Sequence, residues 1–165
     1  MRFKMGSLIG KFVALSAVLS LLGPVSAQVP GKPAGYVTDS ARVLSSDSVS
    51  LLATRCGRFD QAHRAQIAVV TVTSLKGEPI EKAALDLFKK WGLGRKGTDD
   101  GLLLLLSVED RKSRITVGYG LEKTITNSAA ASILDAMKPD LGARRYAAAL
   151  DRALDLLDKL LPAGQ

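Results

Sequence analysis

Nine residues near the middle of the chain, 101–109 (GLLLLLSVE), restrict the possible folds most strongly. Five consecutive leucines in a strand place apolar side chains on both of its faces, because successive side chains point to opposite sides. A strand of this kind is stable in the middle of a sheet that is covered on both sides. The run therefore predicts a sheet between two helical layers.

Two further segments are predicted to be strands of the same sheet. Residues 66–72 (QIAVVTV) are a β-branched apolar run bounded by polar residues, which is typical of a buried strand. Residues 114–120 (RITVGYG) follow the leucine-rich strand after a four-residue polar turn, 110–113, so these two strands should form an antiparallel hairpin.

Four amphipathic segments are predicted to be helices. Ser45 or Ser46 caps the first, Pro79 opens the second, and Thr126 or Asn127 caps the third. The expected ranges are 46–62, 79–91, 127–139 and 143–160.

The resulting element order is α-β-α-β-β-α-α, and the β-α-β crossover favours parallel pairing of the first two strands. Together with the hairpin, this order predicts an α/β fold, a small mixed sheet with helices on both faces. A chain of 165 residues allows one such domain.

Residues 1–27 have the pattern of a cleavable signal peptide. A positively charged start precedes an apolar stretch, 12–22, and small residues (Val-Ser-Ala) occupy 25–27. The alternative, an uncleaved membrane anchor, needs about 20 apolar residues, and this stretch is shorter. We therefore expect cleavage after Ala27, a mature chain that begins at Gln28, and export to the periplasm or the extracellular space.

Charge and residue counts exclude several function classes. The formal charge is +7, and three of the basic residues lie in the leader, which leaves +4 on the mature chain. This mild excess suits contact with an anionic surface and gives no reason to expect nucleic acid as a partner. One cysteine, Cys56, and one histidine, His63, exclude an internal disulfide and a zinc cluster, and they supply a Ser-His-Asp triad poorly. Cys56 is expected to be a buried, inert thiol.

Residues 92–97 (GLGRKG) match the glycine pattern of dinucleotide-binding proteins. That fingerprint must follow a strand and open a helix, so that the phosphates meet a helix N-terminus. Here the glycines follow a helix and precede a strand, so we expect no nucleotide partner.

Carboxylates are the remaining candidates for chemistry. Asp99 and Asp100 precede the central strand on a glycine-rich loop, and Asp39 lies on the N-terminal loop. Hard oxygen ligands on loops suit Ca²⁺ or Mg²⁺. Asp and Gly are equally typical of tight turns, so a purely structural role is the alternative.

Five segments in the same order, spread over residues 35–160, resemble the TPM domain family. They are 37–45 (VxDxAxVLS), 66–72 (QIAVVTV), 91–94 (WGLG), 99–104 (DDGLLL) and 114–122 (RIxxGYGLE). The resemblance identifies residues 36–161 as a TPM-like domain, and the prolines and glycines of residues 28–35 predict an extended lead-in before it. It implies a three-layer, Rossmann-like α/β/α sandwich and export.

The family resemblance also implies candidate site residues. Asp39, Asp99 and Asp100 fall where the family places acidic loop residues, which implies a metal site, with Ca²⁺ as the expected ion. The most distinctive family motif covers Gly118, Tyr119, Gly120 and Glu122, and its role stays open. The glycines permit close backbone approach, and Glu122 either braces a loop or supplies an oxygen ligand.

Two functions follow from the resemblance. Some members of the family are described as acid phosphatases, some bind calcium, and others belong to the photosystem repair machinery of the thylakoid lumen. We expect a non-enzymatic binding module that assembles or maintains envelope proteins, with an envelope or membrane protein as its partner. The alternative is a metal-assisted acid phosphatase, for which Arg95 and Lys96 are the nearby cations. We expect a soluble rather than membrane-anchored protein.

Overall fold

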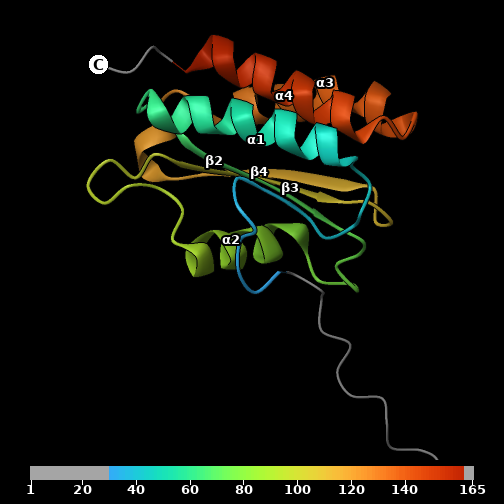
Figure 1. Cartoon of the computed structure of the whole chain (residues 1–165). Helices are drawn as coiled ribbons and strands as arrows, with labels where there is room; N and C mark the ends of the chain where they lie inside the picture. Colours follow the sequence, from blue (N-terminus) through green and yellow to red (C-terminus); the bar gives the residue numbers. More distant parts are fainter. Residues whose placement is uncertain (1–29, 162–165) are drawn as a thin grey trace, which may run out of the picture.

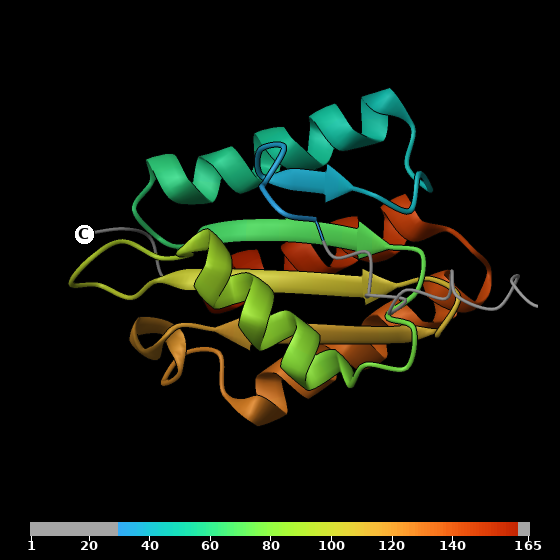
Figure 2. The ribbon, with the colours of Figure 1, turned by 90° about the horizontal axis from the view of Figure 1, so that it is seen from below.

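A computed structural model describes residues 30–161, and the predicted signal peptide lies outside the described residues. Four strands form one sheet in the order β1-β2-β3-β4 (Figure 2). The first three strands are parallel, and β4 is antiparallel to β3. Their bounds are Val37–Asp39 (β1), Gln66–Val72 (β2), Gly101–Ser107 (β3) and Lys112–Val117 (β4).

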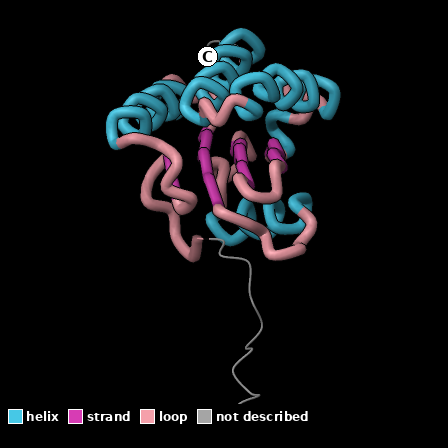
Figure 3. Tube along the Cα trace, turned by 90° about the vertical axis from the view of Figure 1, so that its right-hand side faces the viewer, coloured by secondary structure: helices cyan, strands magenta, loops and turns pink. Residues whose placement is uncertain are grey.

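Helices cover both faces of this sheet. In Figure 1, α1, α3 and α4 lie on one face and α2 lies on the other. Figure 3 shows the same two helical layers from the side. The helices are Ser46–Gln61 (α1), Ile80–Trp91 (α2), Asn127–Gly142 (α3) and Tyr146–Leu160 (α4), and a short 3-10 turn, Tyr119–Leu121 (η1), follows β4. This arrangement confirms the predicted α/β/α sandwich.

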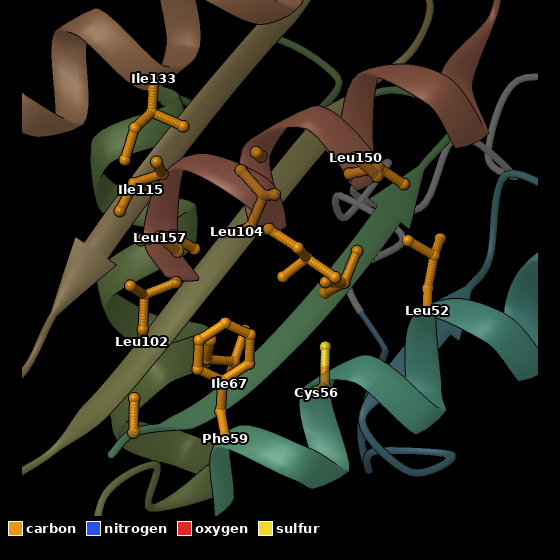
Figure 4. Close-up of a cluster of buried hydrophobic side chains, with 14 of the residues drawn as sticks. Leu52, Cys56, Phe59, Ile67, Leu102, Leu104, Ile115, Ile133, Leu150 and Leu157 are labelled. Carbon is orange, nitrogen blue, oxygen red and sulfur yellow. The ribbon is translucent and has the colours of Figure 1, made fainter. Parts of the chain in front are cut away.

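The leucines of β3 explain why both layers are needed. Leu102 and Leu104 belong to the core under α1, α3 and α4, whereas Leu103 and Leu105 belong to the core under α2. All four side chains are completely buried, because alternate residues of a strand face opposite sides of the sheet. Figure 4 shows the larger core, in which Cys56 lies among apolar side chains. Burial raises the pKa of this thiol to about 12, so it stays protonated and inert.

The predicted helix boundaries have clear local causes. The Ser45 and Thr126 hydroxyls accept hydrogen bonds from the first turns of α1 and α3, at 3.2 Å each. Pro79 precedes α2, and Gly92 ends it in a left-handed conformation with a φ of 60°.

The structure corrects the sequence prediction at four places. Residues Val37–Asp39 form a strand, β1, that was not predicted. Strand β4 runs from Lys112 to Val117, so the predicted turn is shorter and residues 118–120, predicted as strand, lie beyond it. Helix α3 continues through Pro139 to Gly142, and α4 starts at Tyr146.

The two crossovers between the parallel strands have opposite hands. Strands β1, β2 and β3 advance across the sheet in one direction, yet α1 and α2 cover opposite faces (Figure 2). With α2 in front of the sheet, the β2-α2-β3 crossover is right-handed, so the β1-α1-β2 crossover is left-handed. Left-handed crossovers are rare in proteins.

Candidate functional site

The family motif lies at the amino edge of the sheet, which we define as the end where β2 and β3 begin. Residues 118–122 form a turn after β4, called here the 118–122 turn, and it packs against the loop before β3. The Gly118 amide donates to the carbonyl oxygen of Gly101 at 2.8 Å, and the Gly120 amide donates to that of Asp99 at 3.1 Å. These two hydrogen bonds hold the 118–122 turn against the loop before β3.

Glycine is required at both motif positions for steric reasons. A Cβ at position 118 would lie 2.2 Å from the carbonyl oxygen of Asp99. A Cβ at position 120 would lie 1.8 Å from the carbonyl oxygen of Thr98. Both contacts are with backbone atoms, which cannot rotate away. The two glycines therefore permit the close backbone approach that the sequence suggested as one of their roles.

The turn presents one large side chain to solvent. Tyr119 is 82% exposed, more than the other exposed large apolar residues of the described chain. Glu122, at the end of η1, is also exposed. Tyr119 lies between the two glycines, so its backbone is fixed while its ring is free to contact another molecule.

A half-buried ion-pair network lies beside this edge. The Arg95 guanidinium donates to Oδ2 of Asp100 at 2.6 Å and to Oδ1 of Asp60 at 2.7 Å, and the Tyr36 hydroxyl donates to Oδ2 of Asp60 at 2.7 Å. The backbone amide of Arg95 also donates to Asp100, at 2.8 Å. Burial by itself would raise the pKa of Asp60, but the hydrogen bonds from Arg95 and Tyr36 outweigh it and hold that pKa below its ordinary value.

This network involves residues that sequence reasoning missed. The sequence indicates Arg95 only as a phosphate-binding cation, and no local pattern marks Tyr36 or Asp60. Asp60 is 35 residues from Arg95 along the chain, so no local pattern reveals the ion pair. In the fold, both ends of the Arg95 guanidinium are already occupied by carboxylates.

The structure does not bring the three predicted metal ligands together. Asp39 pairs with Thr71 in the sheet register, whereas the Asp100 carbonyl accepts from the Gln66 amide at the other end of β2. The five residue-to-residue steps from Gln66 to Thr71 span about 16 Å. Asp99 and Asp100 therefore lie at the amino edge and Asp39 at the opposite, carboxyl edge.

Two of the three aspartates are engaged in structural contacts. Asp39 accepts hydrogen bonds from the amides of Val43 and Leu44, at 3.2 and 2.9 Å, and from the Thr71 hydroxyl. Asp100 is 6% exposed and is paired with Arg95. Asp99 is exposed and has a left-handed backbone, with a φ of 47°. Over residues 30–161, no three His, Cys, Asp or Glu side chains gather closely enough to hold a metal ion. Calcium binding stays a prediction, and Asp99 is its most accessible carboxylate.

The glycine-rich segment 92–97 follows a helix and precedes a strand, as its sequence context predicts. It runs from the end of α2 into the loop before β3, so its glycines do not open a helix. Gly94 instead packs against the backbone of Gly101, and its amide donates to the Gln66 side chain at 2.7 Å.

In the described part of the chain, no helix is both long and apolar enough to cross a membrane.

A mixed sheet between helical layers, with a glycine-fixed turn at its amino edge, defines a small Rossmann-like α/β/α domain. The family model of the TPM domain matches residues 37–160. The chain therefore belongs to the TPM domain family.

Solved structures of similar fold include proteins from three bacteria. The N-terminal domain of a protein from P. gingivalis has 30% sequence identity and a TM-score of 0.71, with 79% of this chain and 86% of that chain covered. The N-terminal domain of the cg2496 protein from Corynebacterium glutamicum has 20% identity and a TM-score of 0.61, covering 81% and 85%. The BA42 protein from the psychrophilic Bizionia argentinensis has 14% identity and a TM-score of 0.58, covering 73% and 85%. No curated protein matches the chain in sequence.

Proposed function

We propose that this TPM domain is an exported binding module that docks on a protein of the cell envelope through the 118–122 turn. The observation that carries the proposal is the exposure of Tyr119 on a backbone held by close packing. An exposed tyrosine on a rigid turn contributes a large contact area with little loss of conformational entropy on binding. Export is proposed from the signal-peptide pattern of residues 1–27.

The alternative, a metal-assisted acid phosphatase, has weaker support. Phosphoryl transfer needs cations that are free to stabilise the charge on the transferred group. Arg95 donates instead to Asp60 and Asp100. Asp39 is about 16 Å along the sheet from Asp100, so the carboxylates do not form one centre.

Site-specific photo-crosslinking in the cells that produce the protein tests the docking surface. A benzophenone amino acid in place of Tyr119 should give a defined crosslinked product with an envelope protein. The same substitution at Leu51, which is 58% exposed on α1, is the matched control and should not give it. Excess purified wild-type protein should compete for the product, whereas the Tyr119→Ser protein should not. Equal competition by both proteins would show that Tyr119 is not part of the interface.

A phosphatase assay separates the two functions. We expect the purified protein to release no phosphate from a phosphomonoester above background, with or without Ca²⁺. Turnover that disappears in the Asp99→Asn variant would instead favour the phosphatase. Export is tested separately by N-terminal sequencing of protein from the extracytoplasmic fraction, which should begin at Gln28.

A further inference from the structure

A cavity of about 660 Å³ opens at the carboxyl edge of the sheet, the end opposite the 118–122 turn. Its walls come from the end of β3, the turn between β3 and β4, and the connection between α3 and α4. The volume lies within the range of small-molecule sites in proteins. The cavity lies beyond the carboxyl end of β3, and the carboxyl ends of parallel strands are the side of open α/β sheets where ligands commonly bind.

The walls combine an apolar surface with cationic side chains. Leu106, Val108 and Leu141 supply apolar surface, and Tyr146 adds an aromatic ring. The cations are Arg111, Lys138 and Arg144. A site with this composition suits a ligand that has an apolar body and an anionic head group.

The two arginines are available to such a head group. Lys138 pairs with Asp135 at 2.6 Å, but neither Arg111 nor Arg144 has an ion pair with a carboxylate of residues 30–161. Both are exposed, and they come from two turns that are 33 residues apart in the chain. Arginine guanidinium groups bind carboxylates through paired, charge-assisted hydrogen bonds.

Two further charged features border the cavity, one that attracts an anion and one that repels it. Helix α4 begins at Tyr146 without a side-chain cap, so the positive end of its dipole borders the cavity. Glu109 also lines the cavity, and its carboxylate repels any anion, a dianion more strongly than a monoanion.

We propose that this cavity binds a small organic carboxylate, whose head group lies between Arg111 and Arg144 and whose apolar body lies against β3 and α3. The proposal does not depend on the docking function, because the cavity and the 118–122 turn occupy opposite edges of the sheet. The two proposals can therefore be tested separately: the experiment on the cavity can give a negative result while the crosslinking at Tyr119 gives a positive one, or the crosslinking can fail while the cavity binds its ligand.

Titration of the purified protein with 2-naphthoate, followed by backbone amide NMR and calorimetry, tests the proposal. The largest shifts should fall on residues 107–113 and 138–146. The neutral isostere 2-naphthamide and the head group alone, as acetate, should each bind at least about tenfold more weakly, because each lacks one half of the recognition.

Three variants that remove charge sharpen the result. Arg111→Gln and Arg144→Gln should each weaken 2-naphthoate binding about tenfold, the loss expected for a charge-assisted hydrogen bond. Arg42→Gln is the matched control, because Arg42 is exposed, has the same left-handed backbone as Arg111 and Arg144 (φ of 55°, 52° and 56°), and does not line the cavity. It should leave the affinity unchanged.

A fourth variant tests whether the weaker binding of the arginine variants is caused by misfolding. Glu109→Gln removes the repulsive carboxylate and should tighten binding two- to threefold, on the order of 0.5 kcal/mol of repulsion, which a misfolded protein could not do. Lack of binding at millimolar 2-naphthoate would overturn the proposal. So would equal binding of 2-naphthamide, or an equal loss of affinity in Arg42→Gln.

Discussion

The glycines of the family motif show how a residue can be essential without taking part in chemistry. Gly118 and Gly120 are needed because backbone carbonyls of the neighbouring loop occupy the space of their absent side chains. The sequence shows the two glycines, and the resemblance to the TPM domain family identifies them as part of its most distinctive motif. Only the fold reveals which carbonyls they meet, because residues 98–99 and 118–120 are brought together by the β3-β4 hairpin.

Substitution of Gly120 by alanine should destabilise the domain strongly. The added Cβ would lie 1.8 Å from the Thr98 carbonyl oxygen, so one of the two loops must move. We expect a loss of about 3 kcal/mol in the free energy of unfolding, measured in urea. Gly142→Ala is the control, because a Cβ there meets no atom within 4 Å and the variant should stay within about 0.5 kcal/mol of wild type. A wild-type stability for Gly120→Ala would contradict the close packing.

Asp39 and Asp100 make structural contacts, whereas Asp99 is exposed. A test for calcium binding should therefore use a substitution of Asp99. Asp100→Asn would disturb the ion pair with Arg95 whether or not metal binds. Asp99→Asn is the cleaner variant, because asparagine also tolerates a left-handed backbone. We expect about 5 mM Ca²⁺ to raise the Tm of wild type by about 4 °C through mass action, and Asp99→Asn to abolish the rise.

Asp39→Asn is the control for this experiment. It loses part of its hydrogen bonding to the loop before α1 and should lower the Tm equally with and without calcium. An unchanged Tm of the wild-type protein in calcium would show that the family resemblance does not extend to a metal site in this chain.

At the scale of helices and strands, the sequence predicted what local signals encode. The capping residues Ser45 and Thr126, and Gly92 after α2, each act within one turn of a helix, so their effects are visible in a short window. Strand β1 was missed because three residues are too few to show a period of two. It pairs with residues of β2 that are about 32 positions further along the chain. The crossover that joins β1 to β2 is also left-handed, whereas crossovers between parallel strands are almost always right-handed.

Helices α3 and α4 are joined by a buried carboxylate whose contribution depends on pH. Asp140 of α3 accepts from Arg145 at 2.7 Å and from Arg152 of α4 at 2.9 Å. These hydrogen bonds hold the pKa of Asp140 below its ordinary value. The stabilisation is therefore complete above about pH 4, the pKa in the unfolded chain, and is lost as the pH falls through the lower folded value.

Urea unfolding at several pH values tests this link. Asp140→Asn should be less stable than wild type at pH 7, and the difference should shrink between pH 4 and pH 3. Asp135→Asn, on the exposed side of the same helix, should show a small effect that changes little with pH. A constant difference between Asp140→Asn and wild type at all pH values would exclude an ionised Asp140 as the link.

For the whole molecule, the two cores share their central strands. Alternate residues of β2 and β3 enter the core under three helices and the core under α2, so neither core persists without the sheet. Composition and the apolar pattern of β3 were sufficient to predict this layering. The sequence did not predict that the layers are unequal, with a single helix on one face, because that depends on the hand of the first crossover.

This sharing predicts cooperative unfolding. Trp91, the one tryptophan of the chain, lies at the end of α2 and packs against the smaller core, so its fluorescence reports on that layer. Far-UV circular dichroism reports on all helices. The two urea transitions should have the same midpoint, as expected for a single two-state domain. A fluorescence transition at lower urea would show that α2 detaches first.

The arrangement of the 118–122 turn also has an evolutionary consequence. Tyr119 is held between two positions that accept no side chain, yet its own ring touches little of the domain. Mutation at position 119 can therefore alter partner preference at little cost to folding. Neighbouring positions 118 and 120 lack that freedom. A lineage carrying this fold could acquire new binding specificities through a single codon, while the scaffold beneath it stays unchanged.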